Sequence, residues 1–176
     1  MAKSGRDAEK EAVLHVANLM CVAARTAPKA RGIDNIVSTI LNDKEKESLA
    51  QKMEEFGKKT ERPHVFTRDA NSVRQAQALI IIGTKLGPVG LNCGSCGFDN
   101  CQKCEESGAR CAHNSGDLGI AVGSAVSVAS NHRVDNRVMY SVGWTSIKEK
   151  ILGEEVKIAL GIPLSVSGKN IFFDRK

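Results

Sequence analysis

Aromatic side chains are scarce in this chain of 176 residues, where Phe, Trp and Tyr together make up 4% of the sequence. Proteins that bind single-stranded nucleic acid stack its bases on aromatic side chains within a basic groove. The formal net charge is +5, but Lys and Arg are interleaved with Asp and Glu. The sequence therefore has neither a stacking platform nor a basic stripe, and we expect no nucleic-acid partner.

Long apolar runs are also missing. No window approaches the roughly 18 apolar residues that a helix needs to cross a bilayer. The opening MAKSGRDAEKEA has neither the apolar core nor the small-residue cleavage site of a signal peptide. We therefore expect no membrane association and a cytoplasmic location. The P-loop pattern GxxxxGK followed by Ser or Thr, a catalytic triad and paired catalytic carboxylates are absent too, so no catalytic residue is predicted.

Cysteine, by contrast, is concentrated in one place. Five of the six cysteines lie in the run CGSCGFDNCQKCEESGARC, residues 93–111, and only Cys21 lies elsewhere. Secreted disulfide scaffolds spread their cysteines along a short chain, whereas clustered cysteines in a cytosolic protein indicate metal ligation or redox chemistry. Cys21 falls on the apolar stripe of an expected helix, where a single cysteine is ordinarily a small core residue.

The spacing of the clustered cysteines favours an iron–sulfur cluster over a zinc ion. A zinc ion needs four donors near one point, with Zn–S distances of about 2.3 Å, and a zinc knuckle usually supplies them from two well-separated CxxC turns. A four-iron cluster instead has its ligand positions at the corners of a cube. Only four residues separate Cys96 from Cys101, which suits the cluster better. The preceding GTKLGPVGLNCG is rich in glycine, which lets the backbone approach a cofactor closely.

Five thiols compete for the four ligand positions of such a cluster. The compact core of the predicted site is formed by Cys93, Cys96 and Cys101. The fourth ligand is either Cys104 or Cys111. The loop QKCEESGAR is expected to make a helical turn and to reverse at Gly108, which would carry Cys111 back to the cluster and favours Cys111. Cys104 would then be a neighbouring thiol that does not ligate. His113 could line or tune the site, although a surface position is more ordinary for it.

Hydrophobic periodicity predicts an alternation of helices and strands. The expected helices span residues 5–24, 43–57, 69–78 and 117–130. The expected strands span residues 78–83, 137–144 and 155–162. Ser4 and Asp7 form a capping pair for the first helix, and Asp117 is expected to cap the fourth. A short helix capped by the pair Ser146 and Glu149 is expected between the last two strands. The run ALIIIG at 78–83 is typical of a strand buried on both faces.

One basic loop is a candidate anion-binding segment. ARTAPKARGIDNI, residues 24–36, contains Arg25, Lys29 and Arg31 around a proline and a glycine that end the first helix. The ordinary alternative for such a loop is a solvated connection. Lys169 and Arg175, near the end of the sequence, are further candidates for contact with an anionic cofactor.

CGSCGFDNC followed by a later cysteine resembles the motif of small ferredoxin-type domains in corrinoid and electron-transfer proteins. In those domains CxxCGxxxC plus a more distant cysteine binds a 4Fe-4S cluster. Together with DLGIAVGSAV, GIPLSVSGKN and the late FFDR, the motif makes nearly the whole chain similar to an uncharacterised prokaryotic family of ferredoxin-domain-containing proteins. The resemblance implies Cys93, Cys96 and Cys101 as ligands. Cys111 follows sooner than the fourth cysteine of the corrinoid-protein motif, so the fourth ligand stays open between Cys104 and Cys111.

A second resemblance concerns the frame around the cysteines. The order of N-terminal helix, arginine-containing loop with a proline, buried strand and late ALGIP segment resembles the FMN-binding nitroreductase fold. The matching residues are Asp117, Ala121, Ala125, Ala129, Leu152, Gly153, Leu160, Gly161, Ile162 and Pro163. The resemblance implies a homodimer and an FMN phosphate that lies near Arg25 and Arg31.

The sequence thus predicts one α+β domain over residues 1–176, with a nitroreductase-like sheet, surrounding helices and an inserted ferredoxin-type cysteine-rich loop at 88–114. The leading functional hypothesis is an iron–sulfur redox protein that transfers electrons through a 4Fe-4S cluster, coupled to bound FMN in a nitroreductase-like dimer. This activity would make it a flavin-dependent oxidoreductase. The alternatives are a non-enzymatic protein with a structural or sensing cluster, and a zinc-stapled interaction domain.

Overall fold

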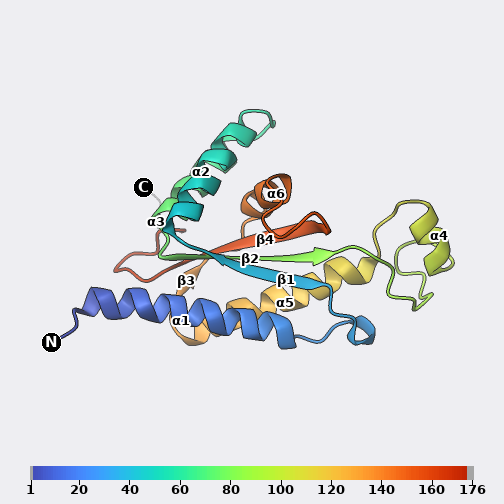
Figure 1. Ribbon diagram of the computed structural model, residues 1–176, viewed down its shortest axis with the longest axis horizontal. Coiled ribbons are helices and arrows are strands. Elements are labelled where there is room, and N and C mark those ends of the chain that lie inside the picture. Colours follow the sequence, from blue (N-terminus) through green and yellow to red (C-terminus); the bar gives the residue numbers. More distant parts are fainter. Residues whose placement is uncertain (1, 174–176) are drawn as a thin grey trace.

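A four-stranded antiparallel sheet lies at the centre of the computed structural model, which describes residues 2–173 (Figure 1). Its strands are β1 (Ile36–Leu41), β2 (Ala78–Lys85), β3 (Asp135–Asn136) and β4 (Val156–Ser165), in the spatial order β1-β2-β4-β3. β2 is central, and its first seven residues are buried. The expected strands at 78–83 and 155–162 are confirmed as β2 and β4.

Helices cover both faces of the sheet (Figure 1). One layer consists of α1 (Gly5–Thr26) and α5 (Ala112–Asn131), and the other of α2 (Asp43–Gly57), α3 (Pro63–Gln75) and α6 (Tyr140–Lys148). Successive side chains of a strand point to opposite faces. Accordingly, Ile80 and Ile82 join the core with Met20 of α1, whereas Leu79 and Ile81 join the core with Met53 of α2. This two-sided burial explains why β2 is a continuous aliphatic run.

Two of the expected helices are confirmed and two have different limits. α1 and α2 match, and the side chain of Ser4 accepts a hydrogen bond from the backbone N–H of Asp7 as expected. α3 begins at Pro63, six residues earlier than predicted, because proline suits the first turn of a helix. α5 begins at Ala112. Asp117 therefore lies inside the helix and does not cap it, and its carboxylate accepts from the backbone N–H of Ala30 at 3.2 Å.

The prediction of a strand over 137–144 is wrong, because Tyr140–Lys148 is a helix, α6. The buried residues of α6 include Ser141, Val142 and Thr145, so the stretch buries a helical face. Ser146 lies inside α6 and donates to the carbonyl oxygen of Val142 at 2.7 Å, so it is not a helix cap. The sequence analysis also missed β1, which lies at an edge of the sheet.

The cysteine-rich segment follows β2 and projects past the end of the sheet as a separate lobe that contains the short helix α4 (Cys101–Glu106) (Figure 1). The segment then leads into α5, whose first turn lies at the base of the lobe. Within the described residues, no helix has both the length and the apolar character that a membrane span requires.

Candidate metal centre

All five clustered cysteines line one pocket in this lobe. The pocket has a volume of about 300 Å³, including its opening to solvent. The cysteines that line the pocket are Cys93, Cys96, Cys101, Cys104 and Cys111. Over residues 2–173, no three His, Cys, Asp or Glu side chains are arranged around the position of a single metal ion. The five thiols line the same pocket, and soft sulfur donors are the ligands that iron–sulfur clusters use.

Turns formed by glycine and asparagine place the first cysteines around the pocket. Gly94 and Gly97 have φ angles of 71° and 84°, and the N–H of Gly97 donates to the carbonyl oxygen of Gly94 at 2.8 Å. Residues with a side chain rarely adopt this left-handed conformation, which glycine adopts easily. The resulting tight turn separates Cys93 from Cys96 and lets both thiols line the same pocket.

Asn92 links the two ends of this turn region. Its side-chain oxygen accepts a hydrogen bond from the backbone N–H of Cys101 at 2.9 Å, and its own N–H donates to the Cys101 sulfur at 3.3 Å. An N–H directed at a sulfur stabilises negative charge on that sulfur. The sequence analysis did not single out Asn92. Its position directly before the first cysteine, in a sequence rich in turn residues, is the only signal that could have indicated it.

The stretch between Cys101 and Cys111 makes a helical turn and reverses, as expected. α4 ends at Glu106, and Gly108 has a φ angle of 68°. After the reversal, Cys111 occupies the N-cap position of α5. The N-terminus of this 20-residue helix carries a partial positive charge and meets the pocket at Cys111.

Cys93 and Cys104 lie in opposite environments. Cys93 is exposed, and its sulfur lies 3.5 Å from Nε2 of His113. Hydrogen bonds from the side chain and backbone of Ser95, followed by one from His113, lower the pKa of Cys93 to about 7. Cys104 is only 1% exposed. Burial is the main cause that raises the pKa of Cys104 to about 11, and the neighbouring thiol of Cys96 contributes.

The two arginines expected near an FMN phosphate contact protein groups. Arg25 forms an ion pair with Asp34, and its Nη1 also donates to the carbonyl oxygen of Ile36 at 2.9 Å. Nη1 of Arg31 donates to the carbonyl oxygen of Val89 at 2.9 Å, and Val89 lines the cysteine pocket. Arg31 therefore contacts the segment that leads into the cysteines.

The remaining basic candidates are not assembled into one cluster. The ammonium group of Lys29 is held by main-chain carbonyl oxygens, among them that of Arg25 at 2.6 Å. Lys169 follows the C-terminal end of β4, the end that pairs with the start of β2. β1 begins at the opposite end of the sheet, where Arg25 lies in the last turn of α1 and Arg31 lies in the connection to β1. Arg175 lies outside the described residues.

Asn114, in the first turn of α5, is a buried polar residue next to the pocket residue His113, and the sequence analysis did not single it out. It is only 1% exposed, and its side-chain oxygen accepts from the N–H of Gly87 at 3.1 Å. Its side-chain nitrogen is buried without a hydrogen-bond partner within the described part of the chain. A buried asparagine follows no sequence pattern here, so nothing in the sequence could have indicated it.

Comparison with known proteins supports both resemblances. Residues 107–175 match the model of a family described as "Uncharacterized protein containing a ferredoxin domain (DUF2148)". An uncharacterized protein of Archaeoglobus fulgidus is 40% identical over 185 residues, which cover 99% of this chain and 98% of that protein.

The solved structures with a similar fold include nitroreductases. A nitroreductase with bound FMN from Bacteroides fragilis superposes with a TM-score of 0.63 at 14% identity, over 92% of this chain and 81% of that chain. A putative NADH dehydrogenase/NAD(P)H nitroreductase from Bacteroides thetaiotaomicron gives a TM-score of 0.58 at 14% identity, over 88% and 74% of the two chains. These similarities confirm the expected α+β, nitroreductase-like fold.

Proposed function

The chain belongs to the family of uncharacterized proteins that contain a ferredoxin domain, and from this we propose that it transfers single electrons through a 4Fe-4S cluster. The observation that carries the proposal is the arrangement of five thiols around one pocket. The residues fit such a group, because a cubane cluster needs four thiolates at separate corners and not at one point. The bound cluster would supply one-electron redox chemistry, and residues 88–114 would form the insertion that holds it.

We propose Cys93, Cys96, Cys101 and Cys111 as the four ligands, with Cys104 as the alternative to Cys111. The contacts of Cys104 support this choice, because its sulfur lies 3.8 Å from the carbonyl oxygen of Ala109 in the geometry of a thiol that donates its proton. In that contact Cys104 packs against the turn between α4 and α5, whereas a ligand sulfur must be a thiolate. Cys111 is also buried, but it occupies the N-cap position of α5, whose partial positive charge lies at the pocket.

The surroundings of the thiols would tune the reduction potential of the cluster. The N–H of Asn92 directed at the Cys101 sulfur and the N-terminus of α5 both favour the more negative, reduced state. The exposed position of Cys93 leaves one side of the pocket open to solvent. A redox partner could approach the cluster from that side.

The finer part of the proposal couples this site to FMN in a cytoplasmic homodimer. Its support is the nitroreductase-like fold, since one of the similar solved structures is a nitroreductase with bound FMN. Arg25 and Arg31 are the residues that we propose for contact with the FMN phosphate, and Lys169, at the other end of the sheet, would reach that phosphate from the partner subunit. Because Arg25 and Arg31 already contact Asp34 and Val89, they would have to exchange these contacts for the phosphate.

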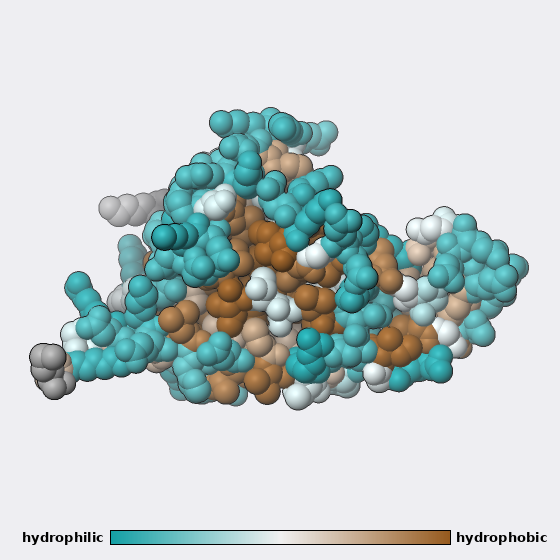
Figure 2. Space-filling view, viewed as in Figure 1, coloured by the Kyte–Doolittle hydropathy of each residue, from teal (hydrophilic) through white to brown (hydrophobic). Residues whose placement is uncertain are grey.

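Two surfaces support a homodimer. On the outer side of the α1–α5 layer, Leu14, Val22 and Ile120 are between 40% and 58% exposed. Figure 2 shows apolar residues gathered over the middle of the molecule, between α1 and α2, where the edge strand β1 lies. Apolar side chains at such positions are commonly covered by a partner subunit.

Anaerobic purification with analysis of iron, acid-labile sulfide and zinc tests the proposal. We expect a brown protein with about four irons per chain and a visible absorption that bleaches on reduction and returns on oxidation. A colourless protein with stoichiometric zinc would refute it. A cluster that cannot be reduced and reoxidised would exclude electron transfer and leave a structural role. Extraction of the same sample tests for flavin, and failure to bind added FMN would refute the flavin part alone.

A further inference from the structure

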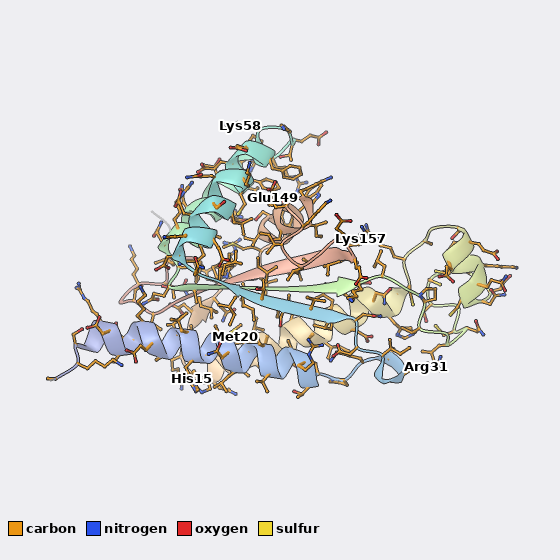
Figure 3. The ribbon with its side chains drawn as sticks, viewed as in Figure 1. His15, Met20, Arg31, Lys58, Glu149 and Lys157 are labelled. Atoms are coloured by element: carbon orange, nitrogen blue, oxygen red, sulfur yellow. The ribbon has the colours of Figure 1, made fainter. Side chains whose placement is uncertain are left out.

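A groove beside β4 lies between α6 and the cysteine-rich lobe. Its volume is about 730 Å³, including the opening to solvent. The lining residues that matter here are Arg110, Tyr140, Trp144, Lys157, Ile158 and Leu160. Residues 157–160 of β4 pair with β2 on one side and, among the described residues, with no strand on the other. Figure 3 shows Lys157 at the end of β4 that faces the lobe.

One wall of the groove is aromatic. Tyr140 and Trp144, the only Tyr and Trp of the chain, are 42% and 46% exposed. Trp144 packs edge-on against Phe56 with ring centroids 5.5 Å apart, and Phe66 lies behind Tyr140 at 6.2 Å. The two exposed rings are thus supported from behind by aromatic packing. Large aromatic surfaces held in place and left half-exposed are suited to stack on a planar ring.

The rim of the groove is cationic. Arg110 and Lys157 are both exposed, and neither forms an ion pair with an acidic side chain within residues 2–173. The lining of the groove contains no Asp or Glu. A guanidinium and an ammonium group that line one groove, with no acidic side chain in its lining, attract a carboxylate, sulfonate or phosphate.

We propose that this groove binds a planar aromatic anion, with its ring against Tyr140 and Trp144 and its charged group on Arg110 and Lys157. Arg110 directly precedes Cys111, whose side chain lines the cysteine pocket. A ligand in the groove therefore lies beside the segment that holds the proposed cluster, and we assign it the role of redox partner: it gains one electron as the reduced cluster is oxidised by one electron. That role rests on the proposed function, whereas binding in the groove does not depend on it.

A neighbouring pocket provides the matched control. It lies on the other side of the two aromatic residues and shares Tyr140 and Trp144 with the groove, but its basic residues are Lys59 and Arg62. It also contains Glu61, whose charge opposes an anion, and it includes no residue of the cysteine-rich lobe. A ligand detected through Trp144 can thus be assigned to one pocket or the other by substitution.

The experiment titrates the purified full-length protein with anthraquinone-2-sulfonate and follows the fluorescence of Trp144. We expect saturable quenching, with Arg110→Gln and Lys157→Gln each weakening affinity about tenfold, because each removes a charge-assisted contact. Lys59→Gln and Arg62→Gln should leave affinity unchanged. The uncharged 2-(hydroxymethyl)anthraquinone should bind more weakly, and inorganic phosphate alone should quench little.

Equal affinity for the charged and uncharged anthraquinones would overturn the proposal. So would a loss of affinity in Lys59→Gln and Arg62→Gln with unchanged affinity in Arg110→Gln and Lys157→Gln. The iron content of each variant is measured alongside, and the titration is repeated on protein from which iron has been removed. Binding should persist after iron removal, because the groove does not include the cluster. Anaerobically purified protein that binds the probe but carries no iron–sulfur cluster would refute the proposed function and leave the groove. Protein that contains the cluster but does not bind anthraquinone-2-sulfonate would refute the groove proposal alone.

Discussion

The guanidinium of Arg31 holds the main chain just before the cysteines, because its Nη1 donates to the carbonyl oxygen of Val89 at 2.9 Å. Gly90 accepts a second, longer contact at 3.5 Å. A Cβ on Gly90 would lie 2.6 Å from the same Arg31 nitrogen, and the φ angle of 73° at Gly90 favours glycine there. The contact connects the loop after α1 to the wall of the thiol pocket.

Arg31→Ala is therefore expected to accelerate loss of iron from the cluster several-fold, because the wall of the pocket would move more freely. The measurement is the rate of iron transfer to a chelator under anaerobic conditions. Arg133→Ala is the matched control, since Arg133 also has a left-handed backbone, with φ of 58° against 54° for Arg31, but lies just after α5, away from the pocket. If Arg31→Ala and Arg133→Ala lose iron at the same rate, the contact between Arg31 and Val89 does not stabilise the cluster.

Substitution of single cysteines tests the ligand set. Cys93→Ser, Cys96→Ser, Cys101→Ser and Cys111→Ser should each reduce iron content to less than about half, because each removes a ligand thiolate. Cys104→Ser should retain its iron. Cys21→Ser is the control, since Cys21 packs against the core of α1 and α5. Full iron in Cys111→Ser together with loss in Cys104→Ser would make Cys104 the fourth ligand.

The parts of the fold that sequence analysis predicted are those where local pattern and burial agree. ALIIIG is aliphatic at every position but its last glycine, and β2 is covered by helices on both faces. α2 has a capping box in which the side chain of Asn42 accepts from the backbone of Glu45, and α2 begins and ends where expected. Such signals are local and need no knowledge of the rest of the chain.

The errors arose where tertiary contacts override local preference. Residues 137–144 are rich in β-branched and aromatic side chains, yet the chain forms α6 because this helix packs on β4 through Gly143 and Val142. In the site, the clustering of the cysteines was visible in the sequence. The contacts made by Asn92, Asn114 and Arg31 were not, because they depend on residues that only the folded chain brings together.

The contact between α6 and β4 predicts a large effect of Gly143→Ala. A Cβ at Gly143 would lie 1.8 Å from the carbonyl oxygen of Ala159, a backbone atom that cannot move without distorting β4. We expect a loss of about 3 kcal/mol in the free energy of unfolding, measured by urea denaturation. Gly116→Ala is the control, because a Cβ there has no neighbour within 4 Å and should raise helix stability slightly. Equal stability of the two variants would contradict the packing.

The helical pair α2–α3 predicts a dependence of stability on pH. Arg74 binds both carboxylate oxygens of Glu54, at 2.7 and 3.1 Å, and this hydrogen bonding lowers the pKa of Glu54 below its ordinary value. The carboxylate therefore stabilises the folded state above the pKa of the unfolded chain, and this contribution is lost as pH falls through the folded value. Because the pair is partly exposed, Glu54→Gln should cost about 0.5 to 1 kcal/mol at pH 7.

Urea denaturation of Glu54→Gln and the unsubstituted protein from pH 7 to about pH 3 checks this expectation. The difference between them should shrink toward zero at the acid end, where Glu54 is protonated. Glu55→Gln is the control, since Glu55 forms its ion pair with Lys52, which is more exposed than Arg74. A difference that stays constant over the whole range would exclude an ionic contribution from Glu54.

The proposed homodimer predicts that one substitution in α5 prevents assembly of the dimer and leaves the fold of the single chain intact. Ile120 is 47% exposed on the outer side of the α1–α5 layer, so Ile120→Glu should leave the fold of the single chain intact. A buried, unpaired carboxylate at a subunit interface is strongly unfavourable, and sedimentation should therefore show a monomer. Val138→Glu is the control, because Val138 is 41% exposed but lies just before α6, outside that layer. A dimer that survives Ile120→Glu would show that the two chains associate through another surface, of which the edge of β1 is the next to test.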